Sequence, residues 1–204
     1  MKNIKILLQD ILRLKKDLQE QKISLPPGLA GMYGEFLVFE KLSNLFAKKG
    51  YSVQYFSGQK SADIQMVNGK RKINIEVKTS RLKDEGYGLW YGAALNIKNC
   101  RDVEHANRYC PHPKRGKVFG DFCYFDHVVF VALDERFSKP RFYIIPQCFV
   151  ERHEKALRNT HKWFSSGTHR LILSNNGEMP KMPADQRKLI HKTEEFEDKW
   201  SAIK

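Results

Sequence analysis

Cysteine is scarce in this chain, and long apolar runs are missing from it. The 204 residues include 4 cysteines, too few for a fold held together by disulfides. The longest strongly apolar run, Val128 to Leu133, is far shorter than the roughly 20 residues that a membrane-spanning helix requires. Polar residues interrupt the apolar ones near the N-terminus and no small-residue cleavage site follows, which argues against a secretory signal. We therefore expect a cytoplasmic protein without a membrane-spanning segment.

Internal repeats and low-complexity segments are also absent from the sequence. Hydrophobic residues make up 41% of the chain and charged residues 29%, a composition typical of folded rather than disordered proteins. A chain of this length can form one domain of ordinary size, but not two full enzymatic domains. We therefore expect a single domain over residues 1–204 with one hydrophobic core.

Acidic residues are too few to balance the basic ones. The chain has 36 Lys and Arg residues against 23 Asp and Glu residues, which gives a formal net charge of +13. An excess of this size on a folded domain favours a polyanionic partner, most often nucleic acid. The alternative is that the charge serves only to keep the protein soluble.

The hydrophobic periodicity is helical before Gly50 and mostly alternating after it. An amphipathic helix is predicted over residues 1–23, followed by a break at Pro26 and Pro27 and a second helix over residues 30–49. The Asn68-Gly69 turn joins two of the predicted strands into a hairpin. In chain order, the predicted strands cover residues 51–56, 62–67, 72–78, 128–133, 142–145 and 170–173. Further helices are predicted over residues 147–159 and from about residue 184.

This order of elements predicts an α/β fold, with a central mixed β-sheet flanked by helices. Residues 81–125 are irregular and rich in glycine, aromatic and basic residues, which favours a functional loop. The N-terminal helix needs an apolar surface to cover. That surface is either its own domain or the same helix of a second subunit.

Apolar and polar residues alternate in the strand predicted at residues 72–78. Ile75 and Val77 point to one face of the sheet, so Glu76 and Lys78 point to the other. A carboxylate and an ammonium group are therefore expected side by side on that face.

Two further carboxylates are expected near this pair. Ile64 belongs to the apolar face of the preceding strand, which turns Asp63 toward the face that carries Glu76. Glu35 falls inside the apolar arc of the second helix, where a carboxylate is costly without a cation or a hydrogen-bond partner. We therefore expect both acids to approach Glu76 and Lys78.

Two or three carboxylates beside one lysine form an oxygen-rich site that suits Mg²⁺, for which Mn²⁺ can substitute. The predicted metal ligands are Asp63, Glu76 and Glu35. The metal would polarise a phosphate and lower the pKa of a bound water, and Lys78 would orient or deprotonate that water. Such a site supports phosphodiester hydrolysis. The alternative is an ordinary ion pair between Glu76 and Lys78, with Asp63 as a turn residue.

The candidate site residues form a motif over about residues 30 to 80. It consists of Asp63, the strand Ile73-Asn74-Ile75-Glu76-Val77-Lys78 and, before them, the helix segment Gly31-Met32-Tyr33-Gly34-Glu35. This motif resembles the core of the PD-(D/E)XK nuclease superfamily, which includes type II restriction endonucleases, Holliday-junction resolvases and repair exonucleases. The resemblance implies that Asp63 and Glu76 hold Mg²⁺ and that Lys78 acts on the attacking water. It also implies that Glu35 is an auxiliary helix carboxylate. Ala62 stands where the name of the motif places a proline, a position without a chemical role.

Within the superfamily, the chain is most similar to a type II restriction endonuclease. More than 100 residues follow Lys78, and they carry most of the aromatic and basic surplus, which favours recognition of a DNA sequence. We expect a homodimer that cuts double-stranded DNA and leaves 5′-phosphate and 3′-hydroxyl ends. The alternatives are a structure-specific junction-resolving or repair nuclease and a non-catalytic DNA-binding module on a nuclease fold.

We expect the single domain to be organised in three parts. Residues 1–25 would be an N-terminal helix, and residues 30–146 the catalytic core with its insertion at 81–125. Residues 147–204 would be a C-terminal extension for DNA recognition or dimerisation.

A second cluster lies in the predicted insertion. Its members are Cys100, His105, Cys110, His112 and Cys123. Four of these residues would suffice for a structural Zn²⁺ site. Their spacing fits no standard zinc finger and a paired Cys-x-x-Cys is missing, so we favour the alternative that they bind no zinc.

Overall fold

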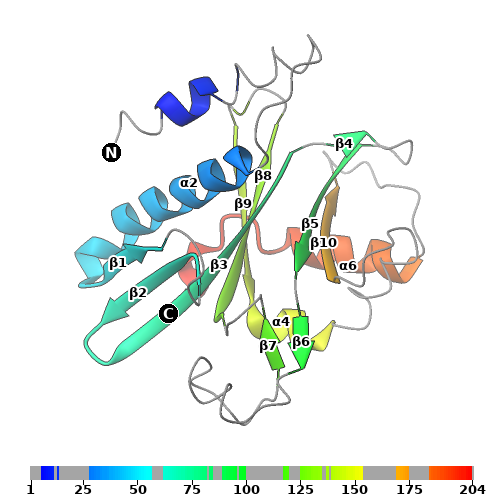
Figure 1. The fold of residues 1–204 in the computed structure, drawn as a ribbon. Helices are drawn as coiled ribbons and strands as arrows, with labels where there is room; N and C mark the ends of the chain where they lie inside the picture. Colours follow the sequence, from blue (N-terminus) through cyan, green and yellow to red (C-terminus); the bar gives the residue numbers. More distant parts are fainter. Residues whose placement is uncertain are drawn as a thin grey trace.

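The fold was analysed in a computed structural model, which Figure 1 shows as a ribbon. The structure describes residues 6–11, 13, 28–56, 62–81, 83–84, 89–95, 97–99, 117–119, 125–134, 137, 139–153, 169–174 and 184–203. Its helices, besides residues 6–11 and 13, are α2 (Leu29–Phe46), η1 (Ala47–Lys49), α4 (Gln147–Arg152), α6 (Ala184–Glu194) and η4 (Trp200–Ala202). Its strands are β1 (Ser52–Tyr55), β2 (Ile64–Asn68), β3 (Arg71–Arg81), β4 (Lys83–Asp84), β5 (Leu89–Leu95), β6 (Ile97–Asn99), β7 (Lys117–Phe119), β8 (His127–Leu133), β9 (Arg141–Pro146) and β10 (His169–Ser174).

A five-stranded mixed sheet forms the centre of the fold, with the strand order β1-β2-β3-β8-β9. Strands β3 and β8 pair in parallel, and the other neighbours pair antiparallel. Strand β5 pairs with β4 and β10 in a second sheet and also contacts β3. The predicted α/β fold with a central mixed sheet flanked by helices is confirmed.

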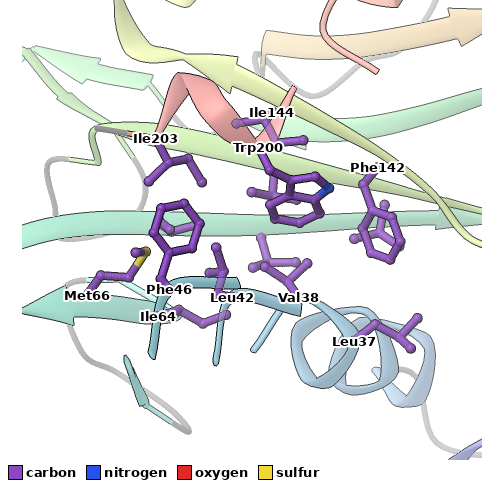
Figure 2. Packing of buried hydrophobic residues seen from close by; sticks show 14 of the residues in the cluster. Leu37, Val38, Leu42, Phe46, Ile64, Met66, Phe142, Ile144, Trp200 and Ile203 are labelled. Carbon is purple, nitrogen blue, oxygen red and sulfur yellow. The ribbon is translucent and has the colours of Figure 1, made fainter. Parts of the chain in front are cut away.

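The central sheet separates two apolar clusters, because successive side chains of a strand point to opposite faces. In β8, Val129 and Val131 belong to the cluster under α2, whereas Val128 and Phe130 belong to the cluster on the α4 and α6 side. Figure 2 shows the cluster under α2, in which the helix side chains meet residues of β2, β9 and the C-terminal segment. Its labelled members are Leu37, Val38, Leu42, Phe46, Ile64, Met66, Phe142, Ile144, Trp200 and Ile203. The continuous apolar run of β8 is thus buried on both faces, as its sequence predicts.

Helix α2 lies directly on β3 because a glycine faces the strand. A Cβ atom at Gly34 would lie only 1.9 Å from the Oγ1 atom of Thr79, so any larger residue would push the helix away from the sheet. This close approach fixes the position of the next residue, Glu35, relative to the middle of β3.

The N-terminal helix contacts its own domain. Leu8 packs against the cluster under α2, and the side-chain amide of Gln9 donates a hydrogen bond of 3.1 Å to the backbone carbonyl of Phe137. Ile6 and Leu7 are exposed. In the part of the chain that the structure describes, no helix is long and apolar enough to cross a membrane.

Most predicted elements are present, but the segment at residues 81–125 differs from its prediction. Strands β4 to β7 occupy parts of it, so the expectation of an irregular segment is wrong for these residues. Strand β5 was missed because its centre, Gly92-Ala93-Ala94, lacks the β-branched residues that mark a strand. The helix predicted over residues 147–159 is observed as α4, and residues 154–159 lie outside the described residues.

Candidate active site

The β2–β3 hairpin brings two acidic residues together on one face of the sheet. Ile64 pairs with Ile75, and continuing this register by one residue sets Asp63 opposite Glu76. Both isoleucines are buried in the cluster under α2, so the two acids point to the other face. The Oδ2 atom of Asp63 also accepts a hydrogen bond of 2.6 Å from the backbone N–H of Val77. The structure thus holds Asp63 against the strand that carries Glu76.

Lys78 completes this group from two residues further along β3. Its Nζ atom forms an ion pair with the Oε1 atom of Glu76, and 30% of the Lys78 side chain and 15% of the Glu76 side chain are exposed. Burial acts to lower the pKa of Lys78, but the carboxylates of Glu76, Asp63 and Glu35 outweigh it and raise that pKa. Lys78 is therefore a protonated ammonium group at neutral pH.

Asp63 is the electrostatically strained member of the group. Burial and the nearby Glu76 carboxylate raise the pKa of Asp63 to about 7, although the backbone N–H of Val77 and the ammonium of Lys78 act in the opposite direction. Glu35 raises the Asp63 pKa by a smaller amount. A further cation beside Asp63 and Glu76 would relieve this repulsion.

Glu35 approaches from the helix and not from the face that carries the other acids. Its Oε2 atom accepts a hydrogen bond of 2.8 Å from the hydroxyl of Tyr55 in β1, and burial together with Glu35 raises the pKa of Tyr55. Among the described residues, no three His, Cys, Asp or Glu side chains are arranged to hold a metal ion. The structure therefore brings Asp63, Glu76 and Lys78 together and leaves Glu35 near them, held by Tyr55.

Two site neighbours were not singled out from the sequence. The first neighbour is Tyr55, which orients Glu35. The alternating pattern of residues 51–56 could have indicated Tyr55, because it turns this side chain to the face covered by α2. The second neighbour is an amide pair: Gln65 donates a hydrogen bond of 2.8 Å from Nε2 to the Oδ1 atom of Asn74. These amides stand two residues from Asp63 and Glu76 along their strands, so they form the next pair on the same face.

The two facing acids are chemically suited to a divalent cation. Asp63 binds Val77 through Oδ2 and Glu76 binds Lys78 through Oε1, which leaves Oδ1 and Oε2 for a further ligand. Mg²⁺ is usually held by one or two carboxylates together with water and phosphate oxygens. The repulsion that raises the pKa of Asp63 would be offset by such an ion. The residues present therefore fit Mg²⁺ or Mn²⁺.

The candidate zinc cluster is not part of this site. Its members, Cys100, His105, Cys110, His112 and Cys123, lie outside the residues that the structure describes.

The raised pKa of Asp63 predicts a pH-dependent stability effect. The pKa of Asp63 is about 7 in the folded protein and about 4 in an unfolded chain. Between about pH 4 and pH 7, Asp63 is therefore protonated more often in the folded protein than in the unfolded chain. The Asp63 contribution to the free energy of unfolding therefore falls as the pH rises from about 4 to about 7. In EDTA at pH 8, Asp63→Asn should raise the free energy of unfolding by about 1–3 kcal/mol and the unfolding temperature by about 2–10 °C, with a smaller gain at pH 5.

Thermal unfolding followed by circular dichroism measures this effect. The exposed Glu195, at the end of α6, supplies the matched control Glu195→Gln, which should change the unfolding temperature little at either pH. If Asp63→Asn instead lowered the unfolding temperature by the same amount at pH 8 and at pH 5, repulsion between Asp63 and Glu76 would not be the cause.

No protein-family model matches the sequence, and no curated protein is similar to it. The structure is similar to that of a bacterial homing endonuclease, I-Ssp6803I, with a TM-score of 0.45 and 16% sequence identity over 88% of this chain and 93% of that one. It is also similar to that of MepB, with a TM-score of 0.37 and 9% identity over 78% of this chain and 93% of that one. Both similarities are too distant to assign an activity.

Proposed function

We propose that this protein is a Mg²⁺-dependent DNA endonuclease whose reaction takes place at Asp63, Glu76 and Lys78. The observation that carries the proposal is the pair of carboxylates that face each other directly before β2 and within β3, with an ammonium group beside them on the same face. The net charge of +13 supports a polyanionic substrate. The motif also resembles the PD-(D/E)XK nucleases, and that resemblance supports the same assignment.

Each side chain has a distinct task in this proposal. Asp63 and Glu76 would hold the metal ion, which when bound supplies the Lewis acidity that polarises a phosphate and acidifies a water. Lys78, kept protonated by its neighbours, would orient the attacking water and offset the negative charge that develops on the phosphate. Its raised pKa favours this task over that of the base. Glu35 would be an auxiliary acid whose position Tyr55 fixes.

Within this function, we propose a type II restriction-like enzyme that recognises a sequence in double-stranded DNA as a cytoplasmic homodimer. The support is the large part of the chain beyond Lys78, which carries many basic and aromatic residues. A nuclease that recognises only the shape of a junction would need less additional surface.

The test is incubation of the full-length protein with long duplex DNA and Mg²⁺, with EDTA as the control. Discrete bands that need Mg²⁺ would support a site-specific endonuclease. Cutting confined to branched DNA would indicate a structure-specific nuclease instead. Binding to DNA without any cutting would overturn the proposed activity and indicate a DNA-binding module.

A further inference from the structure

Exposed cations gather at the tip of the β2–β3 hairpin and in the adjacent η1, which follows α2. This hairpin-tip cluster consists of Lys48, Lys49, Lys70, Arg71 and Lys72, all exposed. The side-chain amide of Asn68 donates a hydrogen bond of 3.2 Å to the backbone carbonyl of Lys49, which ties the two parts of the cluster together. Figure 1 shows the hairpin projecting from the sheet with its tip away from α4 and α6.

The hairpin-tip cluster has little acidic charge near it in the sequence and no ion-pair partner among the described residues. Within residues 41–56 and 62–75, the one acidic residue is Asp63, which already belongs to the candidate active site. In the described part of the chain, no salt bridge joins any of the five cations to a carboxylate. Five exposed positive charges therefore repel one another in the free protein, and an anionic partner would remove this repulsion.

A polar strip connects the cluster to the candidate active site. Lys72, Asn74 and Glu76 point to the face of β3 that is turned away from the cluster under α2, and Asn74 is itself buried. The Gln65–Asn74 amide pair lies between Lys72 and the two acids. At ~3.3 Å per residue, Lys72 lies about 13 Å and Lys70 about 20 Å from Glu76 along the strand.

Resting on the function proposed above, we infer that the hairpin-tip cluster binds backbone phosphates of the DNA duplex that is cut. Base pairs rise by about 3.4 Å along the duplex, so the separation of about 13 to 20 Å corresponds to about 4–6 base pairs from the cut bond. The strip of amides that runs from the acids to Lys72 favours DNA over a membrane or an acidic protein, because one duplex can contact both of its ends. Such contacts position the substrate and carry no sequence information.

The first test removes three charges from the tip in the variant Lys70→Ala/Arg71→Ala/Lys72→Ala. Binding to a 30-base-pair duplex is measured by fluorescence anisotropy between 0.05 and 0.3 M salt, in full-length protein that also carries Glu76→Gln to prevent cutting. Each lost phosphate contact lowers the slope of log affinity against log salt by about 0.9. We expect the slope to fall by about 2 to 3 and the affinity at 0.1 M salt to fall at least about tenfold.

A matched control removes the same number of charges from exposed residues of α6, in Arg187→Ala/Lys188→Ala/Lys192→Ala.

The second test compares both triple variants, now with Glu76 intact, on short duplexes whose cleaved bond has arms of either 3 or 10 base pairs. The tip variant should lower kcat/KM at least about tenfold on the long arms and less than about twofold on the short ones. The α6 variant should affect both lengths equally.

A tip variant with the wild-type salt slope would overturn the inference and leave the proposed endonuclease function intact. A tip effect of equal size on both arm lengths would also overturn it. If the wild-type protein cuts no DNA but the tip variant loses salt-dependent binding, the phosphate-binding tip stands and the endonuclease function falls.

Discussion

Replacing Glu76 with Gln is expected to slow DNA cleavage at least about 1000-fold while leaving the fold and DNA binding intact. The substitution keeps the shape of the side chain but removes the charge with which it would hold a divalent cation opposite Asp63. A metal ion contributes several kcal/mol to stabilising the transition state, and each 1.36 kcal/mol corresponds to about tenfold in rate. Asp63→Asn should have an effect of the same size.

Single-turnover cleavage of a duplex with saturating protein measures this loss, and anisotropy confirms that DNA is still bound. Glu195→Gln removes an equal charge from an exposed position at the end of α6 and should cut at the wild-type rate. If either site variant cut as fast as the wild-type protein, neither carboxylate pairing nor a shared metal ion would be needed for the reaction.

Lys78→Met is expected to slow the chemical step by about 100- to 10 000-fold. The ammonium group forms an ion pair with Glu76, and a methionine of similar length removes its charge without emptying the space. Lys78 also lowers the pKa of Asp63, so its loss should raise that pKa further. The rising limb of the rate against pH should therefore move to higher pH, because Asp63 must be ionised to hold the metal.

The variant Lys78→Arg provides the comparison, since it restores the positive charge with a different geometry. We expect it to recover the position of the pH limb but only part of the rate. A Lys78→Met protein with full turnover and an unmoved pH profile would remove any role for this lysine in the reaction.

The sequence predicts that Asp63 and Glu76 point to the same face of the sheet. It does not predict that the two residues lie directly opposite each other. Alternation of apolar residues alone turns Asp63 and Glu76 to the same side. The Asn68-Gly69 signal predicted the hairpin, but the structure places the tight loop at Gly69 and Lys70, with Asn68 paired to Arg71. A loop centred on Asn68 and Gly69 would set Asp63 opposite Asn74 instead, so this small shift in the turn decides which residue Asp63 faces.

The position of Glu35 shows a second limit of the sequence. Its place in the apolar arc of the helix indicated that it needs a partner, but not which one. The partner is the hydroxyl of Tyr55, from a strand 20 residues away. Gly34 packs onto Thr79 of β3, and the helix also contacts β1. Both are contacts between distant segments that no local pattern encodes.

Mn²⁺ binding shows whether Asp63 and Glu76 together hold one divalent cation. Electron paramagnetic resonance of the full-length protein titrated with Mn²⁺ counts the bound ions without any need for a DNA substrate. We predict one ion per chain in the wild-type protein and in Glu195→Gln, and none at the same Mn²⁺ concentration in Asp63→Asn or Glu76→Gln. Equal Mn²⁺ binding by all four proteins would mean that neither Asp63 nor Glu76 holds the ion.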